Sequence, residues 1–142
     1  MAQMIFVNLP VTELERSIAF YTALGATRDP RFCDDSAAMM VLSDTISVML
    51  LTHERFASFT DRRIADAQTS AQVLNCLSRD SRQHVDDTVT RATVAGAVAD
   101  PCPMQDHGFM YGRSIADPDG HIWEFAWMDV EAAMQQAETA DA

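Results

Sequence analysis

The stretch 117-DPDGHIWEFAW-127 sets one carboxylate, that of Glu124, inside a run of aromatic and aliphatic side chains. Its first four residues are typical of a turn, because proline fixes φ and glycine accepts a positive φ. The residues from 122 on then predict a strand. Side chains alternate between the two faces of a strand, so Trp123, Phe125 and Trp127 share one face and Glu124 lies on the other. A carboxylate there is costly unless it is hydrogen-bonded, paired with a cation or bound to a metal.

The predicted strand belongs to a unit that occurs twice in the chain. Gly25-Ala26 recurs 71 residues later as Gly96-Ala97, and Thr45 corresponds to Gly120 at a spacing of 75 residues. Apolar alternation and helical periodicity predict a strand, a helix and three strands in each copy. The predicted ranges are 5–9, 13–24, 27–32, 38–42 and 46–51, and then 73–77, 82–95, 98–102, 109–116 and 122–127.

The first helix is expected to begin at Thr12. Thr12 and Glu15 have the spacing of a capping box, in which the two side chains satisfy free backbone amides. An apolar stripe of helical period follows, and Gly25 is a typical C-terminal stop. The turn 117–120 is given no chemical role.

The repeat predicts an α+β fold. Two βαβββ modules would place their helices on the outer faces, and their curled mixed sheets would enclose a cavity. We expect one domain over residues 1–142, with module one at about 3–52, a linker at about 53–70, module two at about 71–128 and a C-terminal helix and tail at about 129–142. The Glu124 face would point into the cavity.

Net charge and cysteine content indicate which partners and which compartment to expect. Ten Lys and Arg against 21 Asp and Glu give a net charge of −11, which repels nucleic acid and anionic membrane surfaces. The three cysteines have no metal-type spacing, which favours a reducing compartment. Neither a secretory signal nor an apolar run of about 18 residues is found. We expect a cytoplasmic protein whose partner is a small molecule.

Two segments together carry a resemblance to a known family. The segment 8-NLPVTELERSIAFYTALGA-26 and the stretch 117–127, joined by the duplicated unit, resemble the vicinal oxygen chelate superfamily, which includes glyoxalase I, extradiol dioxygenases and bleomycin-resistance proteins. The resemblance covers about Gln3 to Met128 and implies the fold expected above. It does not specify one activity, since this fold hosts several chemistries.

The resemblance implies four strand positions for the ligands of one divalent metal. Glu124 matches one of them, but the others fall on Phe6, on Met49 or Leu50, and on Val73 or Leu74. These side chains do not suit the ions of such sites. We therefore expect no metal ligand and no cofactor, and no glyoxalase I reaction. The alternative left open is an unconventional site in which His53, His107 and Glu124 bind nickel, zinc, manganese or iron.

The candidate site residues follow from the predicted strand faces and one loop. Glu124 and His107 are the candidate catalytic residues, His107 because it lies in a glycine-containing loop that enters a strand. Arg113 is expected either to pair with Glu124 or to clamp an anionic ligand. The predicted ligand-binding residues are Phe6, Asn8, Met49, Leu51, Tyr111, Arg113 and Glu124.

Three functions remain open from the sequence. The first is a protein that binds a small, partly apolar molecule in the cavity between the sheets without a divalent metal. The alternative is a lyase or dioxygenase-type enzyme that uses Glu124 as acid/base or metal ligand. The third is a structural or regulatory module whose cavity is filled by side chains. A homodimer is expected, because members with two modules in one chain commonly form one.

Overall fold

The computed structural model describes residues 1–141. Two compact units make up the chain. Unit 1 comprises Met1–Ser70 and Pro118–His121, and unit 2 comprises Ala71–Asp117 and the chain from Ile122 on.

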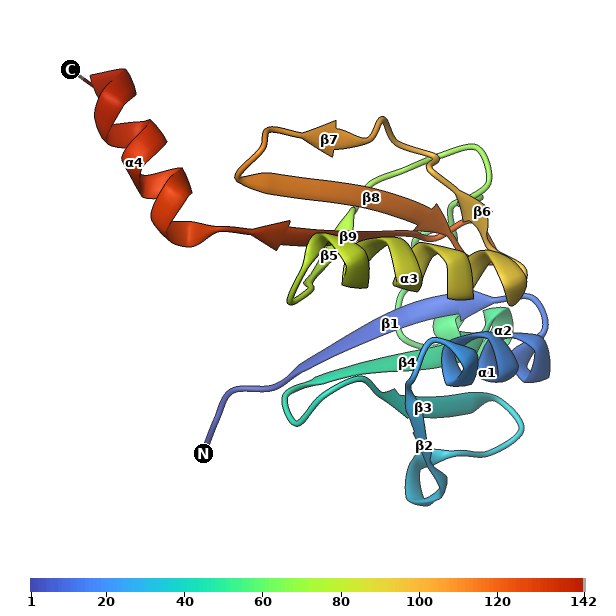
Figure 1. The fold of residues 1–142 in the computed structure, drawn as a ribbon. Helices are drawn as coiled ribbons and strands as arrows, with labels where there is room; N and C mark the ends of the chain where they lie inside the picture. Colours follow the sequence, from blue (N-terminus) through green and yellow to red (C-terminus); the bar gives the residue numbers. More distant parts are fainter. Residues whose placement is uncertain (142) are drawn as a thin grey trace. The chain divides into compact units, whose positions relative to one another are not determined.

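Unit 1 is a four-stranded sheet covered on one face by a helix (Figure 1). The strands lie in the order β1-β4-β3-β2, and the β1–β4 pair is parallel. Apolar side chains facing α1, such as Leu50 and Met40, are fully buried. The elements are β1 (Ile5–Val11), α1 (Leu14–Ala23), β2 (Thr27–Asp29), the 3-10 turn η1 (Pro30–Phe32), β3 (Ala37–Val41), β4 (Ile46–Thr52) and α2 (His53–Ala57).

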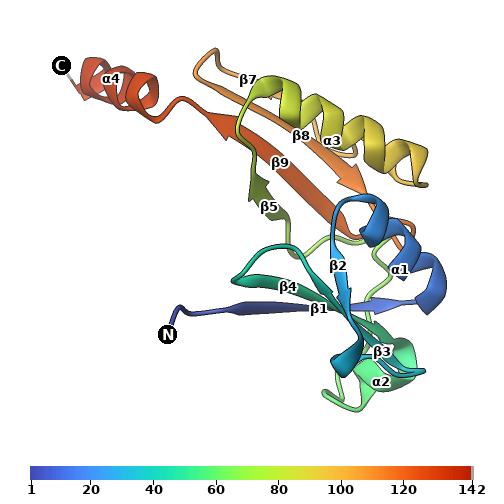
Figure 2. The same cartoon turned by 60° about the horizontal axis from the view of Figure 1, so that its bottom comes forward.

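Unit 2 repeats this arrangement. Its strands lie in the order β5-β9-β8-β6, again with the outer pair β5–β9 parallel, and the short strand β7 also pairs with β8. Helix α3 runs along β8 (Figure 2). The elements are β5 (Asn75–Ser78), α3 (Arg82–Val94), β6 (Val98–Ala99), β7 (Gln105–Asp106), β8 (Met110–Ala116), β9 (Ile122–Met128) and α4 (Val130–Asp141). The predicted α+β class with two βαβββ modules is confirmed, and β7 is an addition that the sequence did not predict.

The strand registers confirm the 75-residue repeat. Val41 pairs with Ser47 at the end of the β3–β4 hairpin, and Ala116 pairs with Ile122 at the end of the β8–β9 hairpin. Both hairpins therefore close over connections of equal length. Met49 is the position in unit 1 that corresponds to Glu124.

The predicted cap of the first helix is wrong. The N-cap residue is Glu13, and its side chain caps nothing. Thr12 instead donates from its backbone amide and its hydroxyl to the carboxylate of Asp119, at 2.9 and 2.8 Å. Tertiary hydrogen bonds therefore take the place of the local capping box. The turn 117–120 fixes the backbone just before α1 through Asp119.

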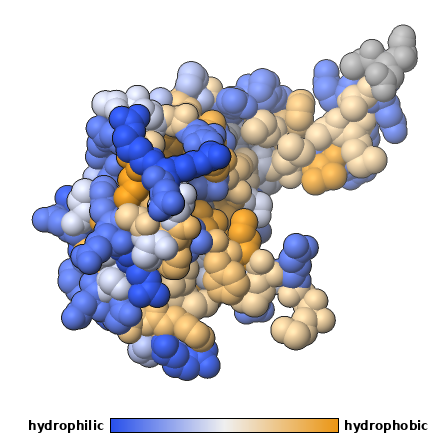
Figure 3. Space-filling view, turned by 180° about the vertical axis from the view of Figure 1, so that it is seen from behind, coloured by the Kyte–Doolittle hydropathy of each residue, from blue (hydrophilic) through white to orange (hydrophobic). Residues whose placement is uncertain are grey.

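Helix α4 follows β9 as the last element of the chain. Figure 3 shows apolar side chains on it among charged ones, and Val130 and Met134 are each 61% exposed. Among residues 1–141, no helix combines the length and the apolar character needed to cross a membrane.

Candidate functional site

Strand β9 separates its aromatic residues from Glu124 as the alternation predicts. Trp123 and Phe125 are 3% and 1% exposed, on the face that α3 covers. Glu124 is half-buried and lies on the opposite face. This face of unit 2 is the candidate site.

Glu124 lies in a row of polar side chains that crosses the sheet. Cys76 of β5 and Ser114 of β8 are directly opposite Glu124 on the two neighbouring strands. The amide of Cys102 donates to the Ser114 hydroxyl at 3.0 Å, which brings a second thiol to the same face. Together with Gln105, these residues line a cavity of about 170 Å³.

The Glu124 carboxylate differs from the other polar groups of this row in its contacts. Among the side chains that the structure describes, those of residues 1–139, none forms a hydrogen bond or an ion pair with it. The Cys76 thiol, directly opposite on β5, has a pKa that is raised by partial burial and, secondarily, by the negative charge of Glu124. A half-buried carboxylate without a donor is costly for a fold to keep. Structural pairing therefore does not explain Glu124.

Arg113 does not supply that partner, so the predicted Arg113–Glu124 pair is wrong. Arg113 is directly opposite Phe125 and thus lies on the helix side of the sheet. Its guanidinium binds Asp100 at 2.7 and 3.1 Å and Asp86 at 3.1 Å. The hydrogen bond to Asp100 is the main reason that the pKa of Arg113 is raised. Because strand alternation decides the face, a cation one residue out of phase cannot meet the carboxylate.

Tyr111 shares the helix side with Arg113. Its hydroxyl donates to Asp86 of α3 at 2.6 Å, and this bond is the main cause that lowers the pKa of Asp86. Burial of the ring raises the pKa of Tyr111 itself. The predicted ligand-binding roles of Tyr111 and Arg113 therefore do not fit the Glu124 face.

His107 is also separate from Glu124. It lies in the exposed turn between β7 and β8, where its ring stacks on Phe109 at a centroid distance of 6.2 Å. It does not line the cavity that contains Glu124. A catalytic partnership of the two residues, as the sequence suggested, is not supported by this placement.

The four candidates in unit 1 share one face of their own sheet. Asn8 is directly opposite Met49, and Phe6 and Leu51 lie on the same side by alternation. Phe6 is 46% exposed, whereas Leu51 is buried. On this face Ser47 is fully buried, and its hydroxyl has no partner among the described residues. The face is mostly apolar and carries no titratable side chain at these positions.

The residues at the four expected metal positions do not fit a divalent ion. Phe6 and Met49 in unit 1 and Leu74 in unit 2 offer neither imidazole nor carboxylate, and only Glu124 does. Among the described side chains, those of residues 1–139, no three His, Cys, Asp or Glu are grouped closely enough to hold a metal ion. Glu124 is thus the one oxygen ligand at these four positions.

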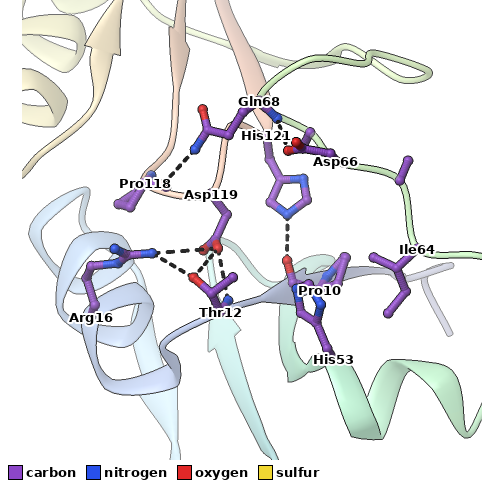
Figure 4. Close-up of a pocket in the computed structure, with 12 residues that line it drawn as sticks. Pro10, Thr12, Arg16, His53, Ile64, Asp66, Gln68, Pro118, Asp119 and His121 are labelled. Carbon is purple, nitrogen blue, oxygen red and sulfur yellow. Dashed lines mark hydrogen bonds and ion pairs between the residues drawn. The ribbon is translucent and has the colours of Figure 1, made fainter.

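A larger cavity of about 510 Å³ lies within unit 1 (Figure 4). Several polar groups around it bind one another. Asp119 accepts hydrogen bonds from Thr12 and pairs with Arg16, and His121 donates to the Pro10 carbonyl at 2.7 Å. Gln68 likewise donates to the Pro118 carbonyl. Since these groups are already satisfied, the smaller cavity beside Glu124 is the better candidate site.

Cys76, Ser114 and Cys102 are site residues that sequence reasoning missed. The repeat contained the signal for Cys76, because Asn8 and Cys76 occupy the same place relative to Met49 and Glu124. Cys102 had no such signal, since its backbone is held by a hydrogen bond to a side chain 12 residues away.

Comparisons with known proteins agree with this fold. A family model described as Glyoxalase/Bleomycin resistance protein/Dioxygenase superfamily matches residues 3–125. A hypothetical protein from S. aureus is 25% identical with a TM-score of 0.74, over 89% of this chain and 94% of that one. An enzyme of the glyoxalase/bleomycin resistance protein/dioxygenase family from Burkholderia phytofirmans PsJN is 18% identical with a TM-score of 0.73, over 89% and 99%. A glyoxalase-related enzyme from Fulvimarina pelagi is 19% identical with a TM-score of 0.73, over 89% and 88%. No curated protein matches the chain.

Proposed function

Because the chain belongs to the glyoxalase/bleomycin resistance protein/dioxygenase superfamily, we propose that it binds a small, partly apolar molecule on the Glu124 face of unit 2, without a divalent metal. One observation carries this proposal. Among the described residues, the half-buried Glu124 carboxylate receives no hydrogen bond and no ion pair. A hydrogen-bond donor on a bound molecule would offset the cost of holding it there.

The walls of the cavity indicate the character of the ligand. Met110, Pro103 and Ala126 contribute apolar surface, while Glu124, Ser114 and Gln105 contribute polar groups. The volume of about 170 Å³ is below the roughly 300–1,000 Å³ of sites for drug-sized molecules. A compact molecule with an apolar body and one or two polar groups fits this description.

The proposed site contains no divalent metal, because too few side chains there can coordinate one. A divalent ion held by Glu124 alone would keep most of its coordination positions filled by water. Leu74, just before β5, and Met49, which corresponds to Glu124 in unit 1, have side chains that do not suit such an ion.

A second candidate function, a lyase-type enzyme with Glu124 as acid/base, is favoured by a different observation. The carboxylate lies opposite the Cys76 thiol, so a proton acceptor and a weak acid line the same cavity. A positioned carboxylate of this kind can transfer protons to or from a bound molecule.

A fragment screen tests the binding function. Chelator-treated protein would be screened against small carbonyl, amide and heteroaromatic compounds by ligand-observed NMR. We expect binders whose signals are lost with Glu124→Ala and kept with Glu131→Ala, an exposed carboxylate on α4. Binders that are equally retained by both variants, or no binders at all, would contradict the proposal.

A further inference from the structure

Cys76 is an accessible thiol beside a carboxylate. It lies on β5, the edge strand of its sheet, directly opposite Glu124, and the residue is exposed to solvent. Its side chain and that of Glu124 line the same cavity of about 170 Å³. A reagent can therefore reach the thiol and the carboxylate together.

No cation activates this thiol. Two arginines near this strand lie on the helix side of the sheet: Arg79, just after β5, stacks over the Phe125 ring at 4.7 Å, and Arg113 of β8 binds Asp86 and Asp100. Besides Cys76, the titratable residues that line the cavity are Glu124, Cys102 and Arg113, and the guanidinium of Arg113 is held by Asp86 and Asp100. Burial and the Glu124 charge raise the pKa of the Cys76 thiol, which keeps it protonated near neutral pH. The thiolate is the nucleophilic form of cysteine, so reaction needs a proton acceptor, and Glu124 is placed to be one.

We propose that Cys76 and Glu124 form a nucleophile and base pair that adds the thiol to a conjugated carbonyl compound, an enal or enone, held in the cavity. The Cys76 S–H bond breaks and its proton passes to the Glu124 carboxylate. The sulfur forms a bond to the β-carbon, and the π electrons of the C=C bond move toward the carbonyl oxygen. Glu124 then returns the proton to the α-carbon, which leaves a thioether and needs no oxidant or reductant. The inference rests on the proposed function, since the electrophile must first bind in the cavity.

The cavity also suits the carbonyl group of such a compound. The Ser114 hydroxyl accepts a hydrogen bond from the Cys102 amide, and its own proton remains available to donate, because the described residues provide no acceptor for it. The Gln105 side chain adds an amide at the cavity wall. Donors placed at a developing oxyanion stabilise it. The apolar wall would hold the carbon skeleton.

The test uses 2-cyclohexen-1-one and mass spectrometry of the full chain. Rates of adduct formation at the three cysteines are measured from about pH 6 to pH 9 in the native protein, in Glu124→Gln and in Cys76→Ser. Cys33 is the control thiol within unit 1, where it donates to the Asp29 carbonyl, and Cys102 is the control within the cavity. Melting temperatures of the variants establish that they are folded.

Glu124 can act as a base or only disfavour the thiolate, and the two roles predict opposite changes in the reaction rate of Cys76 with Glu124→Gln. As a base, Glu124 makes Cys76 the fastest of the three thiols at pH 7, with a rate that saturates with reagent, and Glu124→Gln slows Cys76 about tenfold or more. If the carboxylate only disfavours the thiolate, Glu124→Gln speeds Cys76 up, and the inference is overturned. Equal rates at Cys76 and Cys33 also overturn it.

Saturated cyclohexanone separates this inference from the proposed function. It has the shape of the probe but lacks the C=C bond, so it cannot form the adduct. If cyclohexanone or the fragments bind in a Glu124-dependent way while Cys76 stays unreactive, the proposed reaction of Cys76 is refuted and the proposed binding function is supported.

Discussion

Asp119 and Thr12 are joined by two hydrogen bonds across 107 residues of sequence. The Asp119 carboxylate accepts from the Thr12 amide at 2.9 Å and from the Thr12 hydroxyl at 2.8 Å, and it also receives the Ser17 hydroxyl at 3.3 Å. The turn that introduces Glu124 thus fixes the start of α1. The carboxylate in the turn is structural, whereas that of Glu124 in the following strand receives no hydrogen bond or ion pair from the described residues.

Asp119→Ala is expected to lower the free energy of unfolding by about 2 kcal/mol, because hydrogen bonds to a charged group are lost from a side chain that is 6% exposed. Asp44, which holds the corresponding place in the first hairpin turn and is exposed, provides the matched control. Asp44→Ala should change stability by less than about 0.5 kcal/mol. Urea unfolding measures both, and equal losses would argue against a special role for Asp119.

Gly120→Ala is expected to destabilise unit 1 by about 3 kcal/mol. Gly120 has a φ of +96°, and a Cβ there would lie 2.7 Å from the backbone of Ala67 and Gln68. Gly108 has a φ of +80° but open space around its Cβ position. Gly108→Ala should therefore show the conformational cost alone, about 1–2 kcal/mol. Thermal unfolding distinguishes the two, and a smaller loss at Gly120 than at Gly108 would contradict the close approach.

The ion pair between Asp106 and Arg82 predicts a loss of stability in acid. The hydrogen bond from Arg82 is the main cause that lowers the pKa of Asp106 from 3.8 to about 2. Since the folded pKa is below the unfolded one, the contribution is present above about pH 4 and disappears as pH falls to about 2. It is small, because the pair is exposed.

Asp106→Asn should consequently melt at a slightly lower temperature than the native protein at pH 7, and the difference should vanish near pH 2. Fluorescence of Trp123 and Trp127, the two tryptophans of the chain, follows unit 2. A difference that persists unchanged in acid would show that another effect of the substitution dominates.

Glu124→Gln is expected to lower the pKa of Cys76, because it removes the negative charge that helps to raise it while the burial remains. Thiolate absorbance would be titrated in a background in which Cys33 and Cys102 are serine. An unchanged titration would mean that burial alone sets the pKa of this thiol.

The sequence predicted what depends on strand alternation and on the internal repeat. The buried Trp123–Phe125 face, the open Glu124 face and the correspondence of Met49 with Glu124 all follow from period two and the 75-residue spacing. These features are local, or they repeat within the chain, so one sequence is enough to reveal them.

Features that depend on long-range placement were missed or wrong. Thr12 has the spacing of a capping box, but the carboxylate that it binds lies far along the chain. Pairing with Glu124 was one of two roles expected for Arg113, but Arg113 is opposite Phe125, because the register of β8 against β9 decides its face. Cys102 is likewise brought to the Glu124 face by a hydrogen bond to Ser114, 12 residues away, which the sequence pattern does not indicate. The homodimer and the cytoplasmic location stay predictions.

The most direct test of a binding site without a divalent metal is the metal content of protein purified without a metal-affinity tag. The same protein would then be titrated with nickel, zinc, manganese and ferrous ions under anaerobic conditions. We predict substoichiometric metal and no specific binding of any of the four ions. One tightly held ion per chain that is lost with Glu124→Ala would contradict the account, and would make Glu124 a metal ligand.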